Sequence, residues 1–274
     1  YGGEQDQIGQ EDTPEQFIEN LVDVFRAVRD VLTDDGTLWV NIGDSYYNYR
    51  PGKGQALVKQ TVSKTERDQP QQCARRANKL EGLKEKDLIG IPWMLAFALR
   101  ADGWYLRQDI IWHKPNPMPE SVRDRCTKSH EYLFLLSKNK KYYYDNEAIK
   151  EPVKQDWGTR DRTGGKYHNP GTGLQPHSGL SKSYERKNKR DVWTITNKPY
   201  KGAHFAVFPP ELIEPCILAG SQEGDIVLDP FMGSGTTGMV AKKHFRSFIG
   251  CELHEDYASL QSDRIDSIPP QLVL

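Results

Sequence analysis

The segment DIVLDPFMGSGTTG, residues 225–238, restricts the fold more than any other part of the 274-residue chain. An apolar run that ends in Asp229 enters a glycine-rich turn, and a helix-forming stretch follows directly. The next apolar run, SFIGCE, ends in Glu252, 23 residues after Asp229. In α/β proteins this order binds the nucleoside of a cofactor, because glycines let the backbone come close and the acid accepts hydrogen bonds from ribose hydroxyls.

Three interpretations of this unit are open. Gly233, Gly235 and Gly238 satisfy the G-x-G-x-x-G pattern of dinucleotide sites, as in an enzyme that uses NAD. Pro230 and Phe231, however, give the turn an apolar edge in place of phosphate-facing amides, and no second strand–helix–strand half follows. A tight turn without a ligand is the second interpretation. We favour the third, a site for S-adenosylmethionine.

Apolar spacing along the rest of the chain predicts alternating helices and strands, as in an α/β protein. Thr13 can cap a helix over 14–32 that has Pro14 at its first position. Residues 131–137 and 141–145 are predicted to form a hairpin that turns at 138–140. We expect a mostly parallel twisted sheet with helices on both faces. The other predicted elements are strand 37–42, helix 87–102, strand 104–114, helix 210–219, strand 225–229, helix 236–244, strand 247–252 and a last helix from about 256.

The formal net charge of −1 hides two basic segments. Residues 150–201 hold twelve Lys and Arg against five Asp and Glu, and residues 50–86 hold ten against four. The remaining residues are therefore acidic overall. Positive charge gathered in two segments indicates a polyanionic partner that these segments contact.

The sequence excludes membrane and secreted proteins as classes for this chain. No apolar run approaches the ~18 residues that span a bilayer, and the N-terminus lacks the basic and apolar regions of a signal peptide. The four cysteines lie far apart, which predicts neither a zinc site nor a disulfide framework and fits a reducing cytoplasm.

DPFMGSGTTG and the later Glu252 resemble the cofactor motif of amino-group DNA methyltransferases. The order of further segments resembles the beta class of these enzymes, in which the catalytic half precedes the cofactor half. The segments are GTLWVNIGDSY (36–46), GIPWMLAFALRADGWYLRQDIIWHKPNPMPESVRDR (90–125), SHEYLFLLSK (129–138), YYYD (142–145) and HFAVFPPELIEPCILAGS (204–221). The resemblance covers nearly all of the chain outside the two basic segments.

The resemblance implies an α/β fold, the Rossmann-like sheet of class I methyltransferases in circularly permuted order. The implied parts are a catalytic half at 1–149 that includes the basic loop 50–86, an inserted basic target-recognition region at 150–202, and an S-adenosylmethionine-binding half at 203–274. Glu252 would take the ribose hydroxyls, whereas simple core packing is the alternative for 204–210. The implied cofactor-binding residues are Asp229, Pro230, Phe231, Gly233, Ser234, Gly235, Thr236, Glu252, Phe205, Phe208 and Pro209.

One element of the family pattern, a D/S-P-P-Y/F tetrapeptide, does not occur in this sequence. Its polar residue and a backbone carbonyl would accept hydrogen bonds from the exocyclic amine, and its aromatic side chain would stack on a flipped base. In relatives it lies just upstream of a segment like 1–9. We therefore expect this chain alone to be inactive. The alternative is an inactive DNA- and cofactor-binding protein, if the natural chain starts at Tyr1.

Asp44, at the end of the strand VNIGD, is predicted to hold the flipped base or the catalytic loop. The alternative is an ordinary strand-end aspartate that caps a turn. Tyr46, Tyr47 and Tyr49 are candidates to stack on a base, and His130 is expected to be structural.

Double-stranded DNA is the predicted partner, with RNA and a plain solvated loop as alternatives. Asn169, Gln175 and His177 are candidates to read base edges. The predicted phosphate contacts are Lys114, Arg160, Arg162, Lys166, Arg186, Lys187, Lys189 and Arg190.

Together these features predict an S-adenosylmethionine-dependent DNA methyltransferase that acts on an exocyclic amine. Cytosine N4 is favoured over adenine N6, because residues 2–8 and the strand WVNIGDSYY resemble relatives whose tetrapeptide begins with Ser. The resemblance also fits a prokaryotic or phage origin, and it leaves a homodimer and a cognate restriction endonuclease open.

Overall fold

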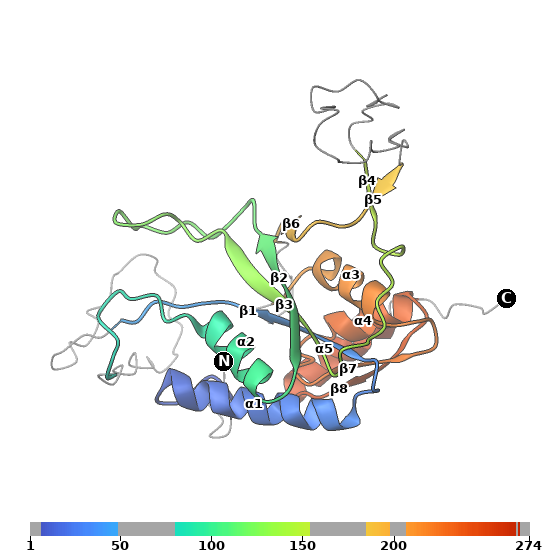
Figure 1. Cartoon of the computed structure of the whole chain (residues 1–274), viewed down its shortest axis with the longest axis horizontal. Coiled ribbons are helices and arrows are strands. Elements are labelled where there is room, and N and C mark those ends of the chain that lie inside the picture. Colours follow the sequence, from blue (N-terminus) through green and yellow to red (C-terminus); the bar gives the residue numbers. More distant parts are fainter. Residues whose placement is uncertain (1–6, 49–79, 154–184, 198–206, 267, 269–274) are drawn as a thin grey trace, which may run out of the picture. The chain divides into compact units, whose positions relative to one another are not determined.

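The computed structural model describes residues 7–48, 80–153, 185–197, 207–266 and 268. The chain divides into two compact units. The first comprises Tyr1–Tyr142 with Cys251–Glu255, and the second comprises Tyr143–Gly250 with Asp256–Leu274. Each unit combines helices with a small sheet (Figure 1). Among the described helices, none has both the length and the apolar character needed to cross a membrane.

The elements follow the predicted alternation closely. The first unit contains α1 (Pro14–Val31), β1 (Thr37–Ile42), α2 (Ile91–Ala101), β2 (Tyr105–His113) and β3 (His130–Ser137). The second contains β4 (Glu151–Pro152), β5 (Arg186–Lys187), β6 (Val192–Thr194), α3 (Pro210–Gly220), β7 (Ile226–Asp229), α4 (Thr236–Lys243) and β8 (Ser247–Gly250), and α5 (Glu255–Asp266) follows β8.

In the first unit β3 lies between β1 and β2 and runs antiparallel to both. Ser137 is the register partner of Thr37 on one side and of Tyr105 on the other. The predicted hairpin of 131–137 with 141–145 is therefore wrong, because both edges of β3 are already paired. The prediction of a mostly parallel sheet is also wrong for these strands, and the described pairings are mixed because β7 and β8 are parallel.

The two helices of the first unit bury one face each. Thr13 caps α1 as predicted, its Oγ1 accepting a hydrogen bond from the Gln16 N–H at 3.2 Å. The helix α2 begins later than predicted, since Leu88 forms an isolated bridge with Tyr46 and Gly90 has a left-handed φ of 86°. Trp93 of α2 packs edge-on against Phe134 of β3, with ring centroids 5.2 Å apart.

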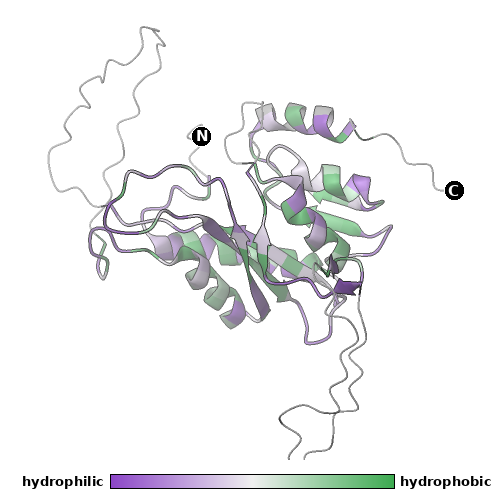
Figure 2. Cartoon of the chain, turned by 90° about the horizontal axis from the view of Figure 1, so that it is seen from above, coloured by the Kyte–Doolittle hydropathy of each residue, from purple (hydrophilic) through white to green (hydrophobic). Residues whose placement is uncertain are grey.

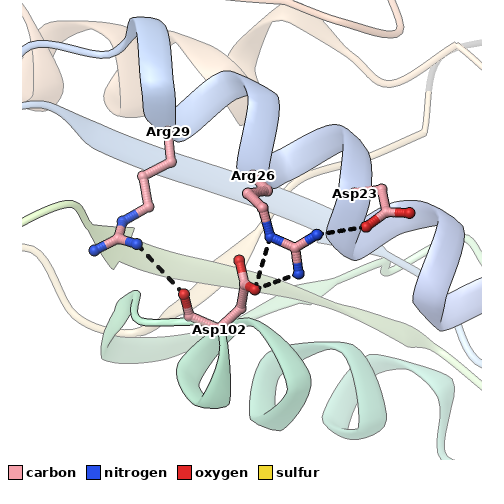
Figure 3. Close-up of polar contacts among 4 residues, drawn as sticks. All are labelled: Asp23, Arg26, Arg29 and Asp102. Atoms are coloured by element: carbon pink, nitrogen blue, oxygen red, sulfur yellow. Dashed lines mark hydrogen bonds and ion pairs between the residues drawn. The ribbon is translucent and has the colours of Figure 1, made fainter.

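A polar cluster joins α1 to the C-terminal end of α2 (Figure 3). The guanidinium of Arg26 donates to Oδ1 of Asp102 from Nε at 3.0 Å and from Nη2 at 2.5 Å. Arg29 donates to the backbone carbonyl of Asp102 at 3.3 Å, and Arg26 also pairs with Asp23. Because Asp102 ends α2, these bonds fix the point where the chain turns into β2.

The second unit has its own core, built on the parallel pair β7–β8. Ile217 of α3 and Val240 and Ala241 of α4 are buried together, and Val227 and Phe248 of the strands pack against them. Figure 2 shows apolar and polar residues alternating around the helices, as expected for helices with one buried face. This core holds the ends of β7 and β8, where the glycine-rich turn begins.

Candidate functional site

The glycine-rich turn joins β7 to α4 in the order predicted from the sequence. Gly235 is the N-cap of α4 with φ 81°, and Gly233 has φ 52°, so both occupy the left-handed region that favours glycine. The Gly235 N–H donates to the carbonyl of Met232 at 3.0 Å. The two glycines therefore allow a tight turn that leads directly into the helix.

Asp229, at the end of β7, holds this turn with both carboxylate oxygens. Oδ1 accepts from the Phe231 N–H at 2.9 Å, and Oδ2 accepts from the Thr237 hydroxyl at 2.5 Å. A carboxylate offers about four lone-pair directions, so two such bonds leave room for a ligand donor. The remaining acceptor positions of Asp229 thus fit the amine or hydroxyl donors of a nucleoside cofactor.

Two glycines of this unit serve packing. A Cβ at Gly238 would lie 2.6 Å from Cε of Met232, and a Cβ at Gly250 would lie 2.6 Å from its Cγ. Met232 is buried, and the side chain fits only because Gly238 and Gly250 lack a Cβ. The third glycine of the G-x-G-x-x-G pattern, Gly238, therefore leaves room for the Met232 side chain of the turn.

The helix α5 holds the same turn from the other side. Nε2 of Gln261 donates to the carbonyl of Gly233 at 2.8 Å, and Nη1 of Arg264 donates to Oγ of Ser234 at 2.8 Å. Neither residue was predicted from the sequence. Their three-residue spacing places them on one helix face, but nothing in the sequence says that this face meets the turn.

The other predicted cofactor residues lie at different depths. Phe231 is 47% exposed, Pro230 is half-buried, and Thr236 is buried. Pro209 is buried as the N-cap of α3 and Phe208 is half-buried, whereas Phe205 lies outside the described residues. In the first unit, Oε1 of Glu252 accepts from the His254 N–H at 3.0 Å.

Asp44 caps the helix α2. Its Oδ1 accepts from the backbone N–H groups of Gly90 at 3.0 Å, Ile91 at 3.1 Å and Ser45 at 2.9 Å. Gly90, the N-cap residue, has no side chain to do this itself. The capping alternative is therefore what the described contacts show, and the predicted part of Asp44 in catalysis stays a prediction.

Lys114 follows β2 and lies against a carboxylate. Its Nζ forms a hydrogen-bonded ion pair with Oε1 of Glu131 and lies 4.1 Å from the centre of the Trp112 ring. Nδ2 of Asn41 donates to the other oxygen of Glu131 at 3.3 Å. A phosphate contact by Lys114, as predicted, would have to compete with Glu131.

Lys128 is a second cation at this end of the first unit, and it was not predicted from the sequence. Its ammonium donates to the backbone carbonyl of Asp44 at 2.6 Å. Burial lowers the pKa of Lys128, although the nearby Asp44 and Glu131 carboxylates act in the opposite direction. Arg125 of the same loop pairs with Glu120 and lies 4.0 Å over the ring of Tyr46. These contacts hold the loop 115–129 against the end of β1.

The described part of the second basic segment includes the antiparallel ladder of β4 with β5, shown in yellow-green and yellow in Figure 1. Glu151 is the register partner of Lys187. Its Oε1 forms ion pairs with Nζ of Lys187 at 3.4 Å and with Nε of Arg190 at 2.6 Å. Arg186 donates to the carbonyl of Lys150 at 2.8 Å. The predicted phosphate contacts Arg160, Arg162 and Lys166 lie outside the described residues.

Lys189 lies in a different environment from its neighbours. Its ammonium is 4.7 Å from the centre of the Trp193 ring, and Trp193 itself donates from Nε1 to the carbonyl of Arg190 at 2.7 Å. Burial lowers the pKa of Lys189, against the attraction of Glu151. Its side chain is thus part of the packing around Trp193.

Comparison with known proteins assigns the chain to a family. The family model described as DNA methylase matches residues 1–263. The Type II methyltransferase M.SmaI of Serratia marcescens is 50% identical over 259 residues, which are 94% of this chain and 77% of that protein. The chain therefore belongs to the DNA methylase family.

Two solved structures share the fold. The PvuII DNA methyltransferase, titled cytosine-N4-specific, aligns with a TM-score of 0.61 and 16% identity over 97% of this chain and 77% of its own. A putative DNA modification methylase from Thermus thermophilus, complexed with S-adenosyl-L-methionine, aligns with a TM-score of 0.58 and 22% identity over 98% and 85%. The fold is thus the mixed α/β fold of class I methyltransferases.

The predicted enzyme class is confirmed by this membership. The chain is a DNA methyltransferase that uses S-adenosylmethionine and acts on an exocyclic amino group. The individual site residues, the division into three parts and the target base stay predictions.

Proposed function

We propose that the protein transfers a methyl group from S-adenosylmethionine to N4 of cytosine in double-stranded DNA. The observation that carries the cofactor part is the turn after β7, where Asp229 keeps lone pairs for a ligand and Phe231 offers an exposed apolar face. When bound, the cofactor supplies an activated methyl group on a sulfonium. Asp229 accepts hydrogen bonds from the cofactor and Phe231 covers its apolar part, while the ribose contact expected of Glu252 stays a prediction from the resemblance.

The remaining predicted residues of this site surround the same elements. The left-handed Gly233 and Gly235 let the backbone approach the ligand, and Ser234 and Thr236 are buried at the start of α4. Pro209 and Phe208 wall the pocket from the start of α3. The protein residues thus bind and orient the cofactor.

The DNA contact is assigned to the second basic segment. The residues Arg186, Lys187 and Arg190 come together at the β4–β5 ladder, where they meet the backbone phosphates of a duplex. We assign cytosine as the target base because residues 2–8 and the strand WVNIGDSYY resemble relatives whose tetrapeptide begins with Ser. Cytoplasmic location, a homodimer and a cognate restriction endonuclease remain part of the proposal.

The test is expression of the complete gene product in a host without DNA methylation, followed by mass spectrometry of the nucleosides. N4-methylcytosine in the host DNA is the expected result. N6-methyladenine instead would overturn the choice of base and leave the enzyme class intact. Unmethylated DNA from cells that contain folded protein would contradict the proposed activity.

A further inference from the structure

The carboxylate of Glu151 lies against two cations of the second basic segment. Glu151 lies on β4, is 22% exposed at its side chain, and accepts from Lys187 and Arg190 through one oxygen. The two cations are 41% and 64% exposed. A ligand from solution can therefore reach both cations, while the carboxylate lies further inside.

The backbone keeps this arrangement in place. Glu151 and Lys187 are direct register partners in the antiparallel ladder, and the Val153 N–H donates to the carbonyl of Glu185 at 3.0 Å. Burial by itself raises the pKa of Glu151, but hydrogen bonds from Arg190 and Lys187 outweigh it and hold the pKa below the usual value. The carboxylate is thus charged at neutral pH and cancels about one of the two positive charges.

From this geometry we infer that Glu151 is an internal competitor of DNA, whose carboxylate holds Lys187 and Arg190 until a backbone phosphate replaces it. The inference rests on the proposed contact of this ladder with a duplex. Its physical consequence is weaker and less salt-dependent binding than the two cations alone would give. A methyltransferase must leave its product after each reaction, and such a competitor favours release.

The magnitude follows from counterion release. The logarithm of the DNA association constant falls with the logarithm of the salt concentration with a slope of about −0.9 for each phosphate neutralised. Removing the charge of Glu151 releases one further cation for a phosphate, so the slope should steepen by about 0.9. For two proteins that bind equally at 1 M salt, this corresponds to roughly eightfold tighter binding of the variant at 0.1 M salt.

The variant Glu151→Gln tests this, because the amide oxygen can still accept from Arg190 while the charge is lost. The matched control is Glu185→Gln, one residue before β5, whose carboxylate has no ion pair with any residue in the described part of the chain. Binding of the full chain to a labelled duplex of mixed sequence is measured by fluorescence anisotropy at several salt concentrations, and thermal melting checks the fold.

The expected result is a steeper slope and tighter binding for Glu151→Gln, with a smaller change for Glu185→Gln. Weaker or unchanged binding by Glu151→Gln, or an equal gain in both variants, would overturn the inference and leave DNA binding intact. Failure of all three proteins to bind the duplex would instead contradict the proposed DNA contact itself, and the inference with it.

Discussion

Replacement of Asp44 by alanine should destabilise the first unit through loss of a helix cap. In the structure Oδ1 of Asp44 accepts from the N–H groups of Gly90 and Ile91 at the start of α2, and Gly90 offers no cap of its own. Loss of an N-cap costs about 0.5–2 kcal/mol, and loss of a negative charge at a helix N-terminus costs about 0.3–1 kcal/mol. We expect a total of about 2 kcal/mol.

The measurement is thermal and urea denaturation of Asp44→Ala and of the matched variant Asp44→Asn. A loss of about 2 kcal/mol lowers the melting temperature by roughly 4–8 °C in a domain of this size. Asp44→Asn keeps the acceptor and loses only the charge, so it should retain most of the stability. An Asp44→Ala protein that melts with the wild type would refute the capping account, and equal losses in both variants would assign the effect to charge alone.

Three further predictions address the second unit. A left-handed alanine alone costs about 1–2 kcal/mol, and Gly235→Ala should lose more stability than this, because its Cβ would lie 3.2 Å from Cα of Gln261. The control is Gly224→Ala, with φ 90° and no atom within 4 Å of its Cβ, and equal losses in urea melts would be inconsistent with the prediction. Partial burial raises the pKa of Glu214, but hydrogen bonds from Lys243 and His244 outweigh it and leave the pKa below its usual value. The stabilisation by these pairs is therefore present above a pH of about 4.3 and is lost as the pH falls through the lowered pKa. The difference in stability between the wild type and Glu214→Gln should close in acid, and a constant difference would argue against the pairs. Lys189→Ala should lower stability without changing the salt dependence of DNA binding, whereas Arg190→Ala should flatten the slope by about 0.9; the reverse pattern would show that Lys189 contacts phosphate.

Local signals in the sequence were sufficient for most elements. The helix α1 has a cap residue, a first-position proline and one apolar stripe, and its start at Pro14 agrees with the prediction. The strand β1 agrees at both ends, since Asp34–Gly36 and Gly43 bound it. The turn after Asp229 was recognised because only glycine favours the backbone conformations that it needs.

Contacts between distant residues were not visible in the same way. The prediction of a hairpin after Ser137 failed because β3 pairs with β1 and β2, which lie far from it in sequence. Asn139 also donates to the carbonyl of Asp34 at 2.7 Å, which ties the chain after β3 to the segment before β1. Alternating apolar residues predict a strand, but they do not identify its partners.

In the candidate site too, local features were predictable from the sequence, whereas contacts between distant residues were not. Sequence identified Asp229 and the glycines, but not Gln261 and Arg264, which reach the turn only after α5 has packed. Lys187 and Arg190 were recognised as cations, while their common partner Glu151 lies about 36 residues earlier in the chain. The count of charges along residues 150–201 includes Glu151 but does not show which cations its carboxylate pairs with.

Calorimetric titration of the chain with S-adenosylhomocysteine, S-adenosylmethionine and NAD tests the cofactor site at the turn after β7. We expect binding of the first two and none of NAD. Phe231→Ala should weaken this binding roughly tenfold through lost apolar contact, while Phe97→Ala, equally exposed at 47% on α2, should bind as the wild type does. Binding of NAD alone, or equal affinity in Phe231→Ala and the wild type, would contradict a cofactor site at the turn after β7.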